Sequence, residues 1–138
     1  MLSLQPAYLA VLKAHVSAET EHKMDETLAT LTGDCVFEDM PSGQVYHGRA
    51  GVRAYYAAWW AAFGNVPTGS RRYVPVDDFM IVETRFTGIH RGPWAGVAPS
   101  GRAIDLPVAI FISFRDGLMS GERFYYDHAT LMRQIGAA

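Results

Sequence analysis

Apolar residues recur at helical intervals over the first part of the chain. Residues 4–16 carry an apolar position in every four, behind Ser3, a residue type that caps helix N-termini. The polar stretch 19–23 interrupts this pattern, and residues 24–31 form a second short apolar face that ends at Gly33. The pattern predicts two consecutive helices.

The clearest helical period covers residues 48–63. Its large apolar and aromatic residues return about every 3.6 positions, with alanines between them. Turn-forming residues at 64–65 and 67–69 are expected to end this helix. Before it, the apolar segment 35–39 predicts a short strand, which the Pro-Ser-Gly turn at 41–43 terminates.

From Arg71 onward the apolar period changes from helical to alternating. This alternation predicts four strands, and the dipeptide 116–117 (Asp-Gly) predicts a tight hairpin between the last two. Asp127 then opens a final short helix that ends at Gly136. The four predicted strands are residues 71–76, 79–90, 102–115 and 118–127.

This order of elements favours the α+β class, because the helices are separate from a run of antiparallel strands. We expect residues 1–138 to form a single domain in which a curved antiparallel sheet wraps around the N-terminal helices. A short twisted sheet covered by helices on one side encloses a cone-shaped cavity.

Composition and charge exclude several classes of protein. The 12 Lys and Arg residues against 14 Asp and Glu give a net charge of −2, which does not match a surface that binds nucleic acid or acidic lipid. A hydrophobic content of 49% argues against disorder, and the longest apolar run, 54–63, is too short to span a bilayer. We see no signal peptide, and the lone Cys35 fits a reducing compartment. We therefore expect a cytoplasmic protein with no nucleic-acid or membrane partner.

Aromatic residues are abundant, at 12% of the chain, and many lie in the helix 48–63. Because adjacent helical residues differ by about 100° around the axis, Trp59 and Trp60 cannot both face the sheet. One face of this helix is expected to pack on the sheet, while the other lines a pocket or meets a second chain. We expect Tyr56, Trp59 and Trp94 among the substrate-binding residues.

The last strand carries the main candidate for chemistry. Alternation places Arg123, Tyr125 and Asp127 on one face. A carboxylate at the closed end of an apolar cavity is desolvated, so its pKa rises toward the range used for acid/base catalysis. Equally, Asp127 can serve only as the N-cap of the helix that follows.

Asp105 is a second candidate acid. Counting back from the turn at 116–117 places it within one residue of the level of Asp127, and two neighbouring acids would have separated pKa values, as an acid/base pair requires. The alternative, an exposed strand aspartate bonded to an arginine, is the more common case.

Among the five histidines, His22 is the best candidate for a pocket, because it falls where the first two helices meet. His15, Glu19 and His22 would share one face if the helix were continuous, but their spacing lacks the context of known zinc helices, and we expect no metal. His90 precedes the loop 91–94 and lies either at the pocket mouth or on the surface.

Other enzyme classes lack their motifs. The chain has no glycine-rich phosphate loop and no dinucleotide-binding fingerprint. Cys35 has no setting that lowers a thiol pKa, and Ser100 lies in a turn rather than at a strand-to-helix nucleophile position. We therefore expect no covalent catalysis.

Several segments, taken in order and spacing over nearly the whole chain, resemble the SnoaL-like polyketide cyclases of the nuclear transport factor 2-like superfamily. They are residues 22–25, 33–38, 46–53, 88–92, 121–127 and 131–136.

This resemblance implies an α+β cone, a homodimer formed through the sheet, and a pocket for a polyketide ester. It also implies an aspartate corresponding to Asp127 as the general acid/base of an intramolecular aldol closure, without metal or cofactor. The polar partners of that aspartate do not carry over residue by residue, and His22, Tyr125 and His90 are the candidates.

The superfamily also offers the ketosteroid isomerases, whose base would correspond to Asp39. The rest of that site is missing, because the positions of its oxyanion-binding groups fall near His15 and near residues 110–111. We therefore expect a cofactor-independent cyclase or isomerase that binds a small hydrophobic carbonyl compound in a deep pocket, with Asp127 and His22 as catalytic residues. The alternative is a non-catalytic module of the same fold that binds a hydrophobic ligand or dimerises.

Overall fold

The computed structural model describes residues 4–64, 66–77 and 79–137, without the side chains of 66–70. Most of the strands lie in the second half of the chain. In chain order the elements are α1 (Pro6–Thr20), α2 (Met24–Ala29), β1 (Leu31–Asp39), β2 (Gln44–His47), α3 (Gly48–Phe63), β3 (Val66–Val76), β4 (Phe79–Ile89), β5 (Ala103–Arg115), β6 (Leu118–Tyr125) and α4 (His128–Gln134).

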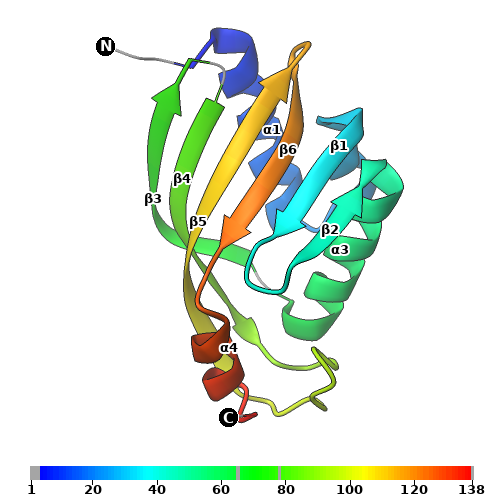
Figure 1. Cartoon of the computed structure of the whole chain (residues 1–138), viewed down its shortest axis with the longest axis vertical. Coiled ribbons are helices and arrows are strands. Elements are labelled where there is room, and N and C mark those ends of the chain that lie inside the picture. The colour runs from blue at the N-terminus through cyan, green and yellow to red at the C-terminus, as the bar shows by residue number, and fades with distance from the viewer. Residues whose placement is uncertain (1–3, 65, 78, 138) are drawn as a thin grey trace.

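The strands form one curved sheet in the order β2-β1-β6-β5-β4-β3 (Figure 1). Figure 1 shows α1 behind the sheet and α3 beside β1 and β2, so both helices cover the same face. Because α1 contacts both the edge strand β3 and the central strand β6, the sheet curves around it. The expected α+β cone is confirmed.

One pairing differs from the expected antiparallel sheet. β1 runs parallel to β6, with Val36 opposite Gly121 and Asp39 opposite Phe124, while the other neighbouring strands are antiparallel. The strands β1 and β6 are far apart in the sequence, so no turn signal could indicate their direction.

Element boundaries differ where local composition misleads. Leu31 begins β1 instead of ending a helical face, and β2 was not predicted because its mostly exposed residues show no alternation. β3 begins at Val66, so residues 67–69 belong to a strand rather than to a turn. The proposed cap Ser3 and the residue Asn65 lie outside the described residues, and Gln5 occupies the N-cap position of α1.

Three local predictions are confirmed. Gly64 ends α3 in the left-handed conformation, with its N–H donating to the carbonyl of Trp60. The hairpin at 116–117 has positive φ at both residues (54° and 78°), as a tight two-residue turn requires. Asp127 caps α4.

Aromatic rings fill the interior on the α3 side of the cone. Phe37 packs edge-on against Tyr55, Tyr56 and Phe124, and Trp59 packs against Phe63 at 4.8 Å between ring centroids. All of these side chains are buried. These aromatic side chains are therefore part of the core, and a role of the aromatic residues in binding substrate stays a prediction.

The inner face of β4 shows how a strand positions side chains on the α1 side of the cone. Burial alternates along the strand, with Met80, Val82, Thr84 and Phe86 buried toward α1. Thr84 is the one polar member of this series.

No helix in the described part of the chain is long and apolar enough to cross a membrane.

The parallel contact between β1 and β6 depends on a residue without a side chain. A Cβ at Gly121 would lie 2.7 Å from the backbone oxygen of Val36 and 3.3 Å from Oγ of Ser113. We expect Gly121→Ala to lower the free energy of unfolding by ~1–3 kcal/mol, because a backbone shift must relieve the overlap. Urea denaturation measures this. The control Gly33→Ala, which meets nothing within 4 Å, should leave stability unchanged or slightly raised, and equal stability of the two variants would contradict the account.

Candidate functional site

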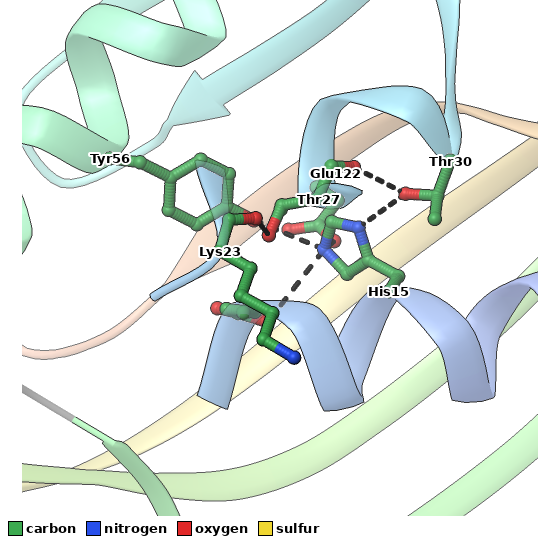
Figure 2. A network of polar contacts seen from close by, with 7 residues as sticks. His15, Lys23, Thr27, Thr30, Tyr56 and Glu122 are labelled. Atoms are coloured by element: carbon green, nitrogen blue, oxygen red, sulfur yellow. Dashed lines mark hydrogen bonds and ion pairs between the residues drawn. The ribbon is translucent and has the colours of Figure 1, made fainter. Parts of the chain in front are cut away.

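A buried polar cluster lies where α1 crosses the start of the sheet (Figure 2). Its centre is His15, only 1% exposed, whose Nδ1 is 2.7 Å from Oγ1 of Thr30. The Thr30 hydroxyl donates its one hydrogen to the Thr27 carbonyl at 2.6 Å, so it accepts from His15. Nδ1 therefore carries a proton in both charge states of His15, and Nε2 is the nitrogen that gains or loses one.

Three groups from three different elements face Nε2 of His15. The Tyr56 hydroxyl of α3 lies 3.0 Å away, Oε1 of Glu122 on β6 lies 3.4 Å away, and Oε2 of Glu19 on α1 lies 3.7 Å away. When His15 is neutral, the Tyr56 hydroxyl can donate to Nε2. When it is protonated, the N–H faces two carboxylates.

Burial and charge act together on the pKa values of this cluster. Burial alone would lower the pKa of His15, but its hydrogen bond to Glu122 and the charges of Glu122 and Glu19 outweigh it, and the pKa is raised above 6.5. Burial raises the pKa of Glu19 from 4.5 to about 7, with Glu122 adding to the shift and His15 and Arg71 opposing it. The site thus holds a carboxyl group that exchanges its proton near neutrality.

A pocket of about 30 Å³ opens beside this cluster, between α1 and the inner face of the sheet. Its polar wall consists of His15, Glu19, Arg71, Thr84 and Glu122. The apolar wall is formed by Leu12, Val16, Tyr73, Val82, Phe86, Ile110 and Ile112. A proton-exchanging carboxyl group in such a pocket can act as a general acid or base on a bound ligand.

Asp127 does not have the environment that alternation suggested. It is exposed and accepts hydrogen bonds from the Thr130 hydroxyl at 2.6 Å and the Ala129 N–H at 3.1 Å. The Thr130 bond, followed by those of the backbone, lowers the pKa of Asp127. The expected desolvation and raised pKa were wrong, because β6 ends at Tyr125 and the alternation does not continue to residue 127.

His22 also lies elsewhere than expected. α1 ends at Thr20 and His22 has a left-handed φ of 55°, so it does not share a helix face with His15 and Glu19. Its exposed ring stacks on Trp60 at 4.4 Å. The pocket histidine is His15. The described residues contain no group of three or more His, Cys, Asp or Glu side chains that could hold a metal ion.

The pocket beside His15 is not lined by Trp59 of α3, nor by Trp94 and His90 of the segment 90–102. Trp59 packs edge-on against Trp94 at 4.7 Å. His90 is fully buried, and its Nδ1 accepts from the Ser100 N–H at 3.1 Å, so the expected surface position was wrong, while the pocket-mouth position stays a prediction. Trp94 and His90 therefore pack this segment against Trp59 and Phe63 of α3.

Asp105 and Tyr125 point to the outer face of the sheet. Asp105 is exposed and forms an ion pair with Arg85 at 2.8 Å, which confirms the alternative of a strand aspartate bonded to an arginine. Tyr125 is 39% exposed and packs edge-on against Phe111 at 5.3 Å. Of the predicted substrate-binding residues, Tyr56 alone reaches the His15 cluster.

Asp39, which corresponds to the base of the ketosteroid isomerases, is buried. It lies at the end of β1 that is farther from the contact between Thr30 and His15. It accepts a hydrogen bond from the Tyr126 hydroxyl at 2.8 Å and lies outside the pocket lining.

Sequence reasoning missed the roles of Glu19, Glu122, Arg71 and Thr84. For Glu122 the signal was present, because the apolar Phe124 two positions later marks the inner face of β6. The weight placed on Asp127 led to the opposite face. Nothing local could have indicated that Thr84 and Glu122, on different strands, line the same pocket as Glu19.

Comparisons with known proteins agree on family and fold. The family model described as SnoaL-like polyketide cyclase matches residues 9–135. The chain is similar in structure to a candidate polyketide cyclase from Xanthomonas campestris pv. campestris (20% identity, TM-score 0.87, covering 97% of this chain and 100% of that one). It is also similar to a candidate SnoaL-like polyketide cyclase from Jannaschia sp. CCS1, with 22% identity, a TM-score of 0.85 and coverage of 100% of this chain and 99% of that one. A third similar structure is an NTF2-like protein from Burkholderia xenovorans LB400, with 16% identity, a TM-score of 0.78 and coverage of 99% of this chain and 100% of that one. No curated protein matches the chain.

The raised pKa of Glu19 predicts how stability depends on pH. Between its ordinary value of 4.5 and about 7 the folded protein binds more protons than the unfolded chain, so the free energy of unfolding falls as the pH rises through this window. We expect Glu19→Gln to remove up to ~3 kcal/mol of this fall, at about 1.4 kcal/mol per pKa unit.

Urea denaturation at about pH 5 and about pH 8 measures the effect, with Glu26→Gln as an exposed control on α2. The Glu19 variant should gain stability relative to the unsubstituted protein at the higher pH, while the control should not. Equal pH dependence in all three proteins would contradict the assignment.

Proposed function

Because the chain belongs to the SnoaL-like polyketide cyclase family, we propose that it is a cofactor-independent acid/base catalyst of the cyclase or isomerase type. Its substrate would be a small hydrophobic carbonyl compound. The observation that carries this proposal is the carboxyl group of Glu19, whose pKa is about 7, in the wall of a mainly apolar pocket. A group that is half ionised near neutral pH is suited to both proton removal and proton return.

The proposed reaction begins with proton transfer to Glu19. Its carboxylate takes a proton from the carbon next to the substrate carbonyl, and the C–H electron pair moves to give an enolate with charge on oxygen. In a cyclase the enolate carbon attacks a second carbonyl of the same molecule, and the resulting alkoxide takes the proton back from Glu19. In an isomerase the proton returns to a different carbon. Neither route needs an oxidant or a metal.

His15 and Glu122 would act as positioning residues in this scheme. His15 lies 3.4 Å from Glu122 and 3.7 Å from Glu19, and its charge and that of Arg71 lower the pKa of Glu19. Burial and the neighbouring charge of Glu122 raise this pKa by more, so the Glu19 carboxyl group keeps its proton to a higher pH, which supports Glu19 as the exchanging group. Tyr56 and Thr30 fix the orientation of the imidazole.

The assignment of the acid/base to Asp127 remains a prediction from the resemblance. Its exposed carboxylate, with a lowered pKa, is a weaker base than Glu19 and has no apolar surroundings that would exclude water. The two assignments give opposite outcomes in one experiment.

Hydrogen–deuterium exchange tests proton removal without knowledge of the natural substrate. The probe is 2-octanone, incubated with the protein in D2O. Its α-proton NMR signals disappear if a base removes these protons and deuterium replaces them. We expect Glu19→Gln to slow this exchange by about 100-fold or more, since general base catalysis contributes about 10²–10⁴-fold. In the unsubstituted protein the rate should rise with pH to a plateau above about pH 7.

Asp127→Asn keeps the capping geometry and should leave the exchange rate within about twofold. Loss of exchange in Asp127→Asn with full exchange in Glu19→Gln would overturn the assignment to Glu19 in favour of Asp127. Binding of the ketone without any exchange would favour the non-catalytic ligand-binding module.

We also propose a second copy of this chain as a partner on the outer face of the sheet. This face carries Val74, Phe111 and Tyr125, of which Val74 and Tyr125 are each 39% exposed, and α1 lies on the opposite face (Figure 1). The same face carries the Arg85–Asp105 ion pair, and a surface with apolar and oppositely charged groups suits a self-complementary interface.

A charged residue among these apolar side chains should separate the copies. We expect the unsubstituted protein to sediment as a dimer at tens of micromolar, and Tyr125→Lys to shift it to monomer, because an ammonium group would lose its hydration in the interface. Leu9→Lys, at an exposed position on α1 and away from this face, is the matched control. A monomeric unsubstituted protein would refute the proposed dimer.

A further inference from the structure

The pocket beside His15 is small. Its volume of about 30 Å³ admits roughly two water-sized groups, since one water needs ~10–15 Å³ on the same measure. A carbonyl group fits such a space, whereas a fused ring system does not. The bulk of any ligand that reaches Glu19 must therefore lie outside this pocket.

A larger groove adjoins the pocket along α1. It has a volume of about 580 Å³ and lies between α1 and the strands β3 and β4. Apart from Lys13 and Ser17, its walls are apolar and consist of Leu4, Leu9, Leu12, Val16, Tyr73, Pro75 and Met80.

The groove and the pocket are adjacent. Leu12, Val16 and Tyr73 line both, so a ligand with its polar end in the pocket would pass these three side chains to reach the groove. From Leu9 to Val16 the groove follows α1 for about 10 Å, at ~1.5 Å per residue. This shape is elongated and suits a chain.

Thr84 supplies a second, independent sign of a ligand. Its side chain is on the inner face of β4, lines the pocket and is 6% exposed, yet its hydroxyl has no hydrogen-bond partner in the structure. A buried hydroxyl without a partner is unfavourable and is normally satisfied by protein, water or ligand. Arg71 on β3 and Thr84 on β4 both line this pocket.

We propose that pocket and groove together bind one amphipathic ligand, a straight-chain aliphatic ketone or ester. Its carbonyl oxygen accepts a hydrogen bond from the Thr84 hydroxyl in the pocket, and its alkyl chain lies in the groove along α1. This rests on the proposed function for the identity of the reacting group, and it narrows the substrate class from any small hydrophobic carbonyl compound to an open-chain one.

The first test is calorimetric titration with methyl n-alkyl ketones from butanone to decanone. If the chain enters the groove, each added methylene should tighten binding about fourfold until the groove is filled. Affinity that does not depend on chain length would overturn the proposal. Leu9→Lys, exposed on α1 and lining the groove, should weaken decanone but not butanone, while Ala10→Lys, outside the groove, should change neither.

The second test concerns the hydrogen bond. Thr84→Val keeps the shape and removes the hydroxyl, so octanone should bind about tenfold more weakly, whereas the alkene in which CH2 replaces the carbonyl oxygen should not. Thr32→Val, a buried threonine outside the pocket lining, should leave both affinities unchanged. Equal effects of Thr84→Val on ketone and alkene would overturn the role of Thr84.

These measurements separate the inference from the proposed function. Chain-length-dependent binding without α-proton exchange supports the groove and refutes the catalytic role of Glu19. Exchange that depends on Glu19 but is independent of chain length supports the catalytic role and refutes the groove.

Discussion

Two carboxylates and one imidazole share a buried space, and the site depends on this constraint. Glu19 and Glu122 lie within 3.7 Å and 3.4 Å of the same nitrogen of His15, and burial of Glu19 outweighs the opposing charges of His15 and Arg71. Most side chains around the pocket are apolar, so an ionised Glu19 carboxylate cannot be hydrated as it would be in water. The group therefore holds a proton to near-neutral pH, at a cost in stability that a purely structural core would not carry.

The architecture explains why this cluster forms on one side of the cone. Aromatic side chains of α3 and the neighbouring strands fill the interior from Phe37 to Trp59, and the space between α1 and the inner face of β4 and β5 stays partly open. The curved sheet brings Glu122 on β6 opposite His15 on α1, and its alternation turns Thr84 toward the same pocket. A site built on one helix and several strands is held by the fold itself rather than by mobile loops.

Local chemistry made part of this structure predictable. The helix at 48–63, the Asp-Gly hairpin and the cap at Asp127 each follow from neighbouring residues, and each is confirmed. Non-local pairing was not predictable, because the parallel contact of β1 with β6 joins segments that no turn connects. The site was missed for the same reason. His15 and Glu19 were visible as a pair one helical turn apart, but the third member, Glu122, comes from a strand more than 100 residues later.

The most direct measurement of the central claim is the carboxyl titration of Glu19 by carbon-13 NMR, with Glu19→Gln used to assign the resonance. The account predicts a midpoint near pH 7. A midpoint near the ordinary value of 4.5 would mean that the carboxyl group is hydrated, and it would contradict both the shared buried charge and the proposed acid/base role.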